Sequence, residues 1–92
     1  MVVTYSTHAE QKLSTRGIAR EDVERIIVRP SETYEDTENN ATVVTGSLGS
    51  RTLVVIYRRT EGDVRVITVY HTQKTEKLLT SKVRRGAWRK TR

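Results

Sequence analysis

The stretch that decides the fold runs from Arg51 to His71 and reads RTLVVIYRRTEGDVRVITVYH. Two runs rich in β-branched and apolar side chains flank the turn residues 61–63, a pattern typical of a β-hairpin. Near the middle of both runs, apolar side chains occupy both faces, as expected of central strands that are covered on both sides. We therefore predict strands over Arg51–Thr60 and Val64–His71.

Two more strands are predicted before this hairpin. Thr42–Leu48 precedes it and is joined to it by a Gly49-Ser50 turn. A short polar strand at Glu32–Asp36 comes earlier and is followed by the turn residues 38–40. The four strands should form an antiparallel meander, with Glu32–Asp36 at its edge.

Two helices are predicted before the strands. The first begins at the capping box Thr7-His8-Ala9-Glu10, with Thr7 as the N-cap, and ends at Gly17. The second has its N-cap at Ala19 and ends at Pro30, which disfavours helical geometry at the preceding residue. Because the central strands need cover, both helices are expected on one face of the sheet.

A short third helix is predicted near the C-terminus. Leu78, Leu79 and Val83 are spaced for one side of a helix, and Gly86 would end it. Trp88–Arg92 is then expected to be a mobile basic extension.

The expected fold class is α+β, with two N-terminal helices on one face of a four-stranded antiparallel sheet. This domain would cover residues 1–73, and residues 74–92 would form a basic C-terminal helix and tail. The net charge of the chain is +6, but eight basic residues and one acidic residue follow position 73, so the tail carries +7 and the rest −1.

A concentrated positive tail predicts a polyanionic partner, since neutralising phosphates releases condensed counterions. Nucleic acid is the leading candidate; a solvated tail or an arm for an acidic protein is the alternative. The tail residues predicted to bind RNA are Lys74, Lys77, Lys82, Arg84, Arg85, Arg89 and Lys90.

Several classes of site and location are disfavoured. The chain has no cysteine, which excludes disulfides, thiolate metal sites and a cysteine nucleophile. Its two histidines lie far apart and no metal-ligand spacing or nucleotide-binding motif is present, so no metal or cofactor is expected. The apolar runs have strand length and no export signal is apparent, so we expect a cytoplasmic protein without a membrane segment.

Four short motifs resemble a widespread bacterial, archaeal and phage family of small domains of unknown function. They are Ser6-Thr7-His8-Ala9, then Arg16-Gly17-Ile18 with Asp22-Val23, then Pro30, and finally Val66-Ile67-Thr68-Val69-Tyr70. That family is grouped by fold similarity with barnase, EndoU, colicin nucleases and RelE-like toxins. The resemblance implies a pair of helices on a four-stranded antiparallel sheet, a scaffold often used to cleave RNA.

RNA cleavage without a metal ion needs groups that accept and donate protons and cations around the phosphate, because the 2′-hydroxyl is the nucleophile. His8 is the candidate for proton transfer, as it lies in the first turn of the first helix and imidazole titrates near neutral pH. His71 ends the last strand. The alternative for each histidine is a half-buried or surface polar residue.

Thr68 and Tyr70 are the candidates in the last predicted strand. A hydroxyl inside an apolar strand either bonds locally or faces a site, and the resemblance favours a site for Thr68. Tyr70 either donates to the phosphate or covers the sheet edge. Strict alternation puts both on one face with Val66, and puts on the other face Ile67, Val69 and His71.

Arg51 is the first candidate for a phosphate clamp, because a guanidinium fork matches a pair of phosphate oxygens. Arg16 is the second, since the resemblance places it at the helix junction. An arginine just before Gly17 also suits the carbonyls at a helix end.

The leading prediction is a metal-independent endoribonuclease of toxin type, which cleaves RNA by attack of the 2′-hydroxyl and is neutralised by an acidic antitoxin protein. One alternative is a non-catalytic module that binds RNA or the ribosome through the basic tail. Another is an adaptor that binds a protein at the exposed edge Glu32–Asp36. Only catalysis requires His8, Arg51 and Tyr70 to meet.

Overall fold

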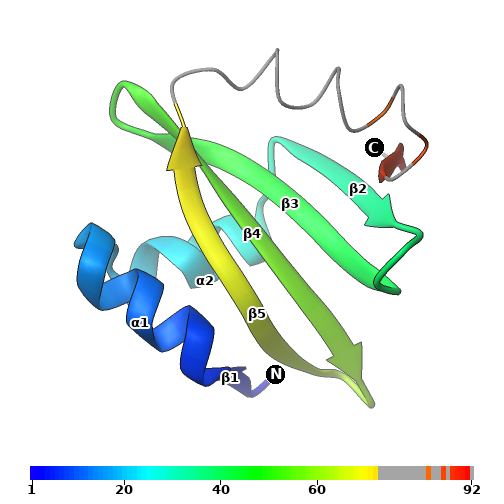
Figure 1. The fold of residues 1–92 in the computed structure, drawn as a ribbon, viewed down its shortest axis with the longest axis horizontal. Coiled ribbons are helices and arrows are strands. Elements are labelled where there is room, and N and C mark those ends of the chain that lie inside the picture. The colour runs from blue at the N-terminus through cyan, green and yellow to red at the C-terminus, as the bar shows by residue number, and fades with distance from the viewer. Residues whose placement is uncertain (73–82, 84–85, 87, 92) are drawn as a thin grey trace.

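The computed structural model describes residues 1–72, 83, 86 and 88–91 of the 92-residue chain. Within them, two helices lie against one side of a twisted six-stranded sheet (Figure 1). The elements are β1 (Val3–Tyr5), α1 (Thr7–Arg16), α2 (Arg20–Val28), β2 (Glu32–Asp36), β3 (Ala41–Leu48), β4 (Arg51–Thr60), β5 (Asp63–Thr72) and β6 (Trp88–Lys90). The strand order is β1-β5-β4-β3-β2-β6; β1 and β5 are parallel, and the other neighbours are antiparallel.

The prediction of a four-stranded antiparallel sheet is wrong, because β1 adds a parallel strand beside β5. Hydrogen bonds from the Val64 amide to the Val2 carbonyl and from the Ser6 amide to the Val66 carbonyl, both 2.9 Å, flank the pairing. A three-residue strand is too short to show the alternation that marks longer strands in a sequence.

The basic extension predicted at the C-terminus is also corrected, since Trp88–Lys90 forms β6 and pairs with β2. The Trp88 ring lies 6.0 Å from that of Tyr34, and only 3% of Trp88 is exposed. Burial of this apolar ring provides a strong reason for β6 to join the sheet. As a result, β2 is an inner strand and not the exposed edge that the adaptor hypothesis required.

The third helix predicted over Leu78, Leu79 and Val83 falls mainly outside the described residues. Of these three residues Val83 is described, and it has a helical conformation.

The helix boundaries follow local signals. Ser6, and not Thr7 as predicted, caps α1: its hydroxyl accepts from the Ala9 amide at 3.0 Å and donates to the Ile67 carbonyl at 2.8 Å. Gly17 ends α1 with φ of 63°, a left-handed conformation that glycine adopts without steric cost. The second helix has its N-cap at Ala19, as predicted, and ends before Pro30.

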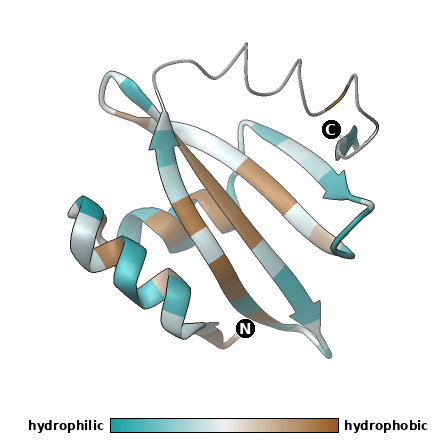
Figure 2. Cartoon of the chain, viewed as in Figure 1, coloured by the Kyte–Doolittle hydropathy of each residue, from teal (hydrophilic) through white to brown (hydrophobic). Residues whose placement is uncertain are grey.

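The core has one layer on each face of the sheet. Both helices pack on the same face, and the cluster between them and the sheet consists of Ala9, Leu13, Ile18, Val23, Ile26, Ile27, Val44, Leu53, Val55, Tyr57, Val64, Val66 and Val69. A smaller cluster on the opposite face consists of Tyr34, Val43, Val54 and Trp88, with Ile56 and Tyr70 packed against it. Figure 2 shows hydrophobic segments in the middle of β4 and β5, the strands that lie between these two layers.

A β-bulge in β5 changes which side chains share a face. Tyr57 pairs with Val66, but Ile56 pairs with Thr68, so Ile67 is an extra residue in the strand. Val66 therefore faces the helices, while Thr68 faces away from them. The alternation predicted from the sequence, which put these two residues on one face, is wrong for this reason.

Among the described residues, neither helix has the length and apolar character needed to cross a bilayer.

Candidate functional site

One pocket joins the start of α1 to the sheet face opposite the helices. It has a volume of about 270 Å³ and is lined by His8, Asp36, Asn39, Ile56, Arg58, Ile67 and Thr68. We call it the His8 pocket. It brings together two residues that the sequence analysis selected, His8 and Thr68, although 60 positions separate them.

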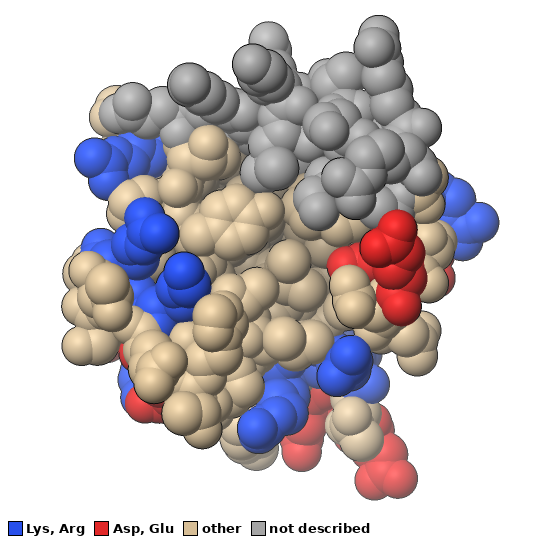
Figure 3. Space-filling view, viewed as in Figure 1, with Lys and Arg blue, Asp and Glu red and all other residues tan. Residues whose placement is uncertain are grey.

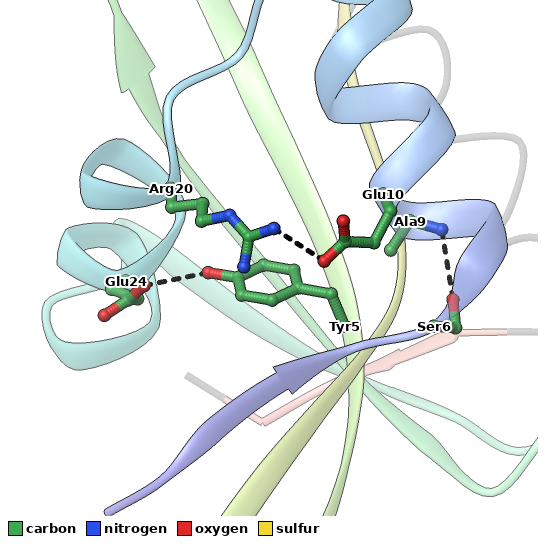
Figure 4. Close-up of polar contacts among 6 residues, drawn as sticks. All are labelled: Tyr5, Ser6, Ala9, Glu10, Arg20 and Glu24. Atoms are coloured by element: carbon green, nitrogen blue, oxygen red, sulfur yellow. Dashed lines mark hydrogen bonds and ion pairs between the residues drawn. The ribbon is translucent and has the colours of Figure 1, made fainter.

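The start of α1 is fixed at this pocket by polar contacts on both sides of Ser6. Ser6 caps the helix and also bonds to the bulge residue Ile67, which lines the pocket. One residue earlier, the Tyr5 hydroxyl donates to a Glu24 carboxylate oxygen at 2.9 Å (Figure 4). Burial and this hydrogen bond raise the pKa of Tyr5, so it remains a donor. His8, in the first turn of α1, is thereby held beside β5 with an exposed side chain.

A second set of contacts holds α1 against α2. The Arg20 guanidinium stacks over the Tyr5 ring, 4.7 Å from its centroid, and bonds to a Glu10 carboxylate oxygen at 2.6 Å. Figure 4 shows Arg20 between the ring and Glu10, on the α2 side of α1. A cation over an aromatic face and an ion pair together define the orientation of α1 better than either contact alone.

Arg58 supplies the positive charge of the His8 pocket. It lies on the same face of β4 as Ile56, which pairs with Thr68. Its Nη2 and Nε atoms donate to the Asn39 carbonyl at 3.0 and 3.4 Å. A guanidinium has five N–H groups, so this anchored side chain retains donors for an anion.

Asp36 holds the turn that anchors Arg58. Its carboxylate accepts hydrogen bonds from the Glu38 amide at 3.0 Å, and from the Asn39 amide at 3.1 Å and side-chain amide at 3.0 Å. Burial by itself raises the pKa of Asp36, but the hydrogen bonds from Asn39, Glu38 and the Trp88 side chain outweigh it, so the pKa lies below its usual value. Asp36 therefore acts as a charged acceptor beneath the pocket.

Arg51 lies elsewhere. Its Nη1 atom is 3.2 Å from Nε2 and 3.3 Å from Nδ1 of His71, on the face that carries the helices. Arg51 and Arg58 are seven residues apart on one strand, or about 23 Å at about 3.3 Å per residue. The two side chains therefore extend from opposite ends of β4 and from opposite faces of the sheet.

Tyr70 shares a face with Thr68 but does not line the His8 pocket. It packs against the cluster that contains Trp88, and burial raises its pKa to about 12. The meeting of His8, Arg51 and Tyr70 that the sequence analysis required for catalysis is therefore not found, and the His8 pocket contains His8, Thr68 and Arg58 instead.

The other predicted RNA-binding residues are distributed as follows. Arg16 is exposed at the end of α1, where the Leu13 carbonyl accepts from the Gly17 and Ile18 amides. Arg89 and Lys90 form ion pairs with Glu35 at 2.6 Å and Glu32 at 2.8 Å. The residues outside the described part of the chain are Lys74, Lys77, Lys82, Arg84 and Arg85.

The sequence analysis did not select Asp36 or Asn39, and it did not include Arg58 in the predicted catalytic site. Alternation along β4 already put Arg58 on the face opposite Arg51. The alternation could not show the bulge that turns Thr68 to the face of Arg58. It also could not show the strand pairing that brings Asn39 beside Arg58.

No cluster of three or more His, Cys, Asp or Glu side chains suited to a metal ion is found within the described residues.

Comparison with known families identifies the chain by residues 5–71, which match the family described as domain of unknown function DUF4258. The chain belongs to the DUF4258 family. The match extends from Tyr5 to His71 and so includes every residue that lines the His8 pocket of this DUF4258 domain. The family description names no activity. Neither the curated proteins nor the solved structures contain a match.

Proposed function

We propose that this DUF4258 domain is a metal-independent endoribonuclease that cleaves RNA in the His8 pocket. The observation that carries the proposal is the meeting of an imidazole, a guanidinium and a hydroxyl at one opening, from three separate elements. These are the groups that the transfer of a phosphoryl group to a neighbouring ribose oxygen requires.

In the proposed reaction, the 2′-hydroxyl oxygen attacks the adjacent phosphorus and His8 accepts its proton. The bond from phosphorus to the 5′-oxygen of the next nucleotide breaks, and that oxygen takes a proton from a water molecule. The hydroxide left behind takes the proton from His8, which restores the neutral imidazole. The products end in a 2′,3′-cyclic phosphate and a 5′-hydroxyl. Arg58 stabilises the negative charge that develops on the phosphate oxygens, and Thr68 donates a hydrogen bond to one of them.

The biological setting that we propose is that of a toxin. A free ribonuclease in the cytoplasm, acting on RNA in solution or on the ribosome, needs an inhibitor. An acidic antitoxin segment over the His8 pocket would pair with Arg58, which is exposed and has unused donors.

The direct test is incubation of the purified chain with end-labelled RNA in EDTA. We expect fragments with cyclic phosphate ends and no cleavage where a single 2′-deoxynucleotide replaces the residue before the cut. We expect His8→Ala and Arg58→Ala each to lower the rate by about 100-fold or more, the usual size of a proton-transfer or charge-stabilising group.

Arg59→Ala is the matched control, since it removes the same charge from the next position of β4. Arg59 extends to the other face, where it bonds to the Tyr57 hydroxyl at 3.3 Å. Intact RNA at micromolar protein, or equal cleavage by the His8→Ala and wild-type chains, contradicts the proposal. Tight RNA binding without cleavage would favour the non-catalytic binding module.

A further inference from the structure

The two flanks of α1 differ in charge. Ala9 and Leu13 are buried and face the sheet. On the flank toward α2, Glu10 is held by the Arg20 ion pair at 2.6 Å. The other flank carries His8, Lys12 and Arg16 at intervals of four residues, the spacing that puts side chains on one side of a helix. We call these three residues the α1 stripe.

Lys12 and Arg16, the two cations of the α1 stripe, have no acidic partner among the described residues. The ion pairs there involve Arg20, Arg25, Arg89 and Lys90. Glu10, the acid of α1, is already paired with Arg20. Figure 3 shows Lys and Arg side chains gathered over α1, next to the sheet face that the helices leave free. This surface can accept an anion without breaking a described ion pair.

The α1 stripe leads into the His8 pocket, because its first member lines that pocket. At about 1.5 Å of rise per residue, Lys12 lies about 6 Å and Arg16 about 12 Å along the helix from His8. The positive charge therefore continues outward from the proposed reaction site in regular steps.

A second pair of cations lies on the opposite side of the pocket. Arg58 and Arg65 are direct partners across β4 and β5, so their side chains extend from the same face of the sheet. Like charges directly opposite each other destabilise a sheet. An anion bound between them would remove this repulsion.

We propose that the His8 pocket takes single-stranded RNA, with the backbone of the strand running from Arg65 across Arg58 and His8 and along Lys12 and Arg16. This inference rests on the proposed function and specifies its substrate. A cationic track beside one strand is the usual device for binding single strands, whereas double-stranded RNA is bound across successive grooves. The α1 stripe, about 12 Å long, suits the former.

The test measures binding separately from cleavage. A fluorescent oligonucleotide with 2′-deoxy sugars throughout lacks the nucleophile, so its affinity can be measured by anisotropy over a range of salt concentrations. For Lys12→Gln with Arg16→Gln we expect about tenfold weaker binding at low salt and a salt slope smaller by about 1.4, because each phosphate that a cation neutralises accounts for about 0.7 of the slope. Arg65→Gln should lower the slope by about 0.7.

Two controls distinguish a direct effect on phosphate binding from a change in net charge or in folding. Arg29→Gln removes the same charge after the end of α2, and should leave the slope unchanged. Lys12→Arg with Arg16→Lys keeps the charges and should bind as the wild type does. Circular dichroism checks that each variant is folded.

A double variant with the wild-type salt slope overturns the inference, even if the chain cleaves RNA. Equal or tighter binding of a duplex of the same sequence also overturns it. Binding of a polyglutamate peptide with the same dependence on Lys12 and Arg16 would assign the stripe to an acidic protein instead. If the expected salt slopes are found but ribose oligonucleotides stay intact, the binding track stands and the cleavage proposal fails.

Discussion

Asp36 lines the His8 pocket and supports it through the turn that anchors Arg58, so its replacement should disturb the pocket. Asp36→Asn keeps the shape of the side chain but removes the charge and puts an amide opposite the Asn39 amide. We expect a loss of about 1–3 kcal/mol in the free energy of unfolding, the range for a buried charged acceptor. Urea unfolding followed by circular dichroism measures it. Equal stability would mean that the turn does not depend on Asp36.

Stability should also depend on pH in the acid range. The pKa of Asp36 is lowered in the folded chain, and the Lys90 hydrogen bond, with a smaller contribution from Tyr34, lowers the pKa of Glu32. A lowered folded pKa contributes stability that is present above the unfolded pKa and is lost as the pH falls through the folded pKa. We therefore expect the free energy of unfolding to decrease below about pH 4, near the ordinary carboxyl values.

Asp36→Asn separates the two carboxylates in the same experiment. The variant should lose part of this acid dependence and keep the part due to Glu32. An acid dependence as steep as that of the wild type would show that the titration of Asp36 is not the cause.

At the scale of elements, the contact between α2 and β3 depends on a residue without a side chain. A Cβ atom at Gly46 would lie 2.6 Å from Cγ1 of Ile26, well inside normal contact. Gly46→Ala should therefore destabilise the chain by about 1–3 kcal/mol through overpacking. The same substitution should cost less in an Ile26→Ala background, where the clashing atoms are gone. Additive effects in this double-mutant cycle would contradict the close packing.

The elements of the hairpin and the helices could be predicted because their signals are local. The strand Arg51–Thr60 has the predicted bounds, and Gly17 and Pro30 mark the helix ends. Each of these depends on a few adjacent residues, such as a left-handed glycine or an apolar run between turns.

Two elements, β1 and β6, and the face on which Thr68 lies could not be predicted, because each depends on contacts between residues that are far apart in the sequence. The strands β1 and β6 have three residues each, and β6 is held on β2 by contacts with residues more than 50 positions earlier, such as the packing of Trp88 beside Tyr34. The bulge at Ile67 depends on the pairing of β4 with β5, so the face occupied by Thr68 could not be read from β5 alone. Because the bulge turns Thr68 to the face of the sheet that carries Arg58, the sequence did not show that these two residues share a pocket.

At the scale of the whole molecule, Trp88 tests whether the last strand belongs to the cooperative fold. It is the one tryptophan of the chain, so its fluorescence reports the docking of β6 on β2. We expect fluorescence and circular dichroism to give the same unfolding midpoint. Trp88→Ala should cost about 3–5 kcal/mol, as expected for a buried aromatic ring. An earlier fluorescence transition would mean that β6 detaches separately.

The bond between the Trp88 side chain and Asp36 joins residues 52 positions apart. A ribosome makes the chain from its N-terminus, so Asp36 emerges well before its indole partner exists. The set of hydrogen bonds to the Asp36 carboxylate, which supports the turn that anchors Arg58, is therefore complete only after residue 88 has been added to the chain. A growing polypeptide that has not yet reached residue 88 therefore lacks this support.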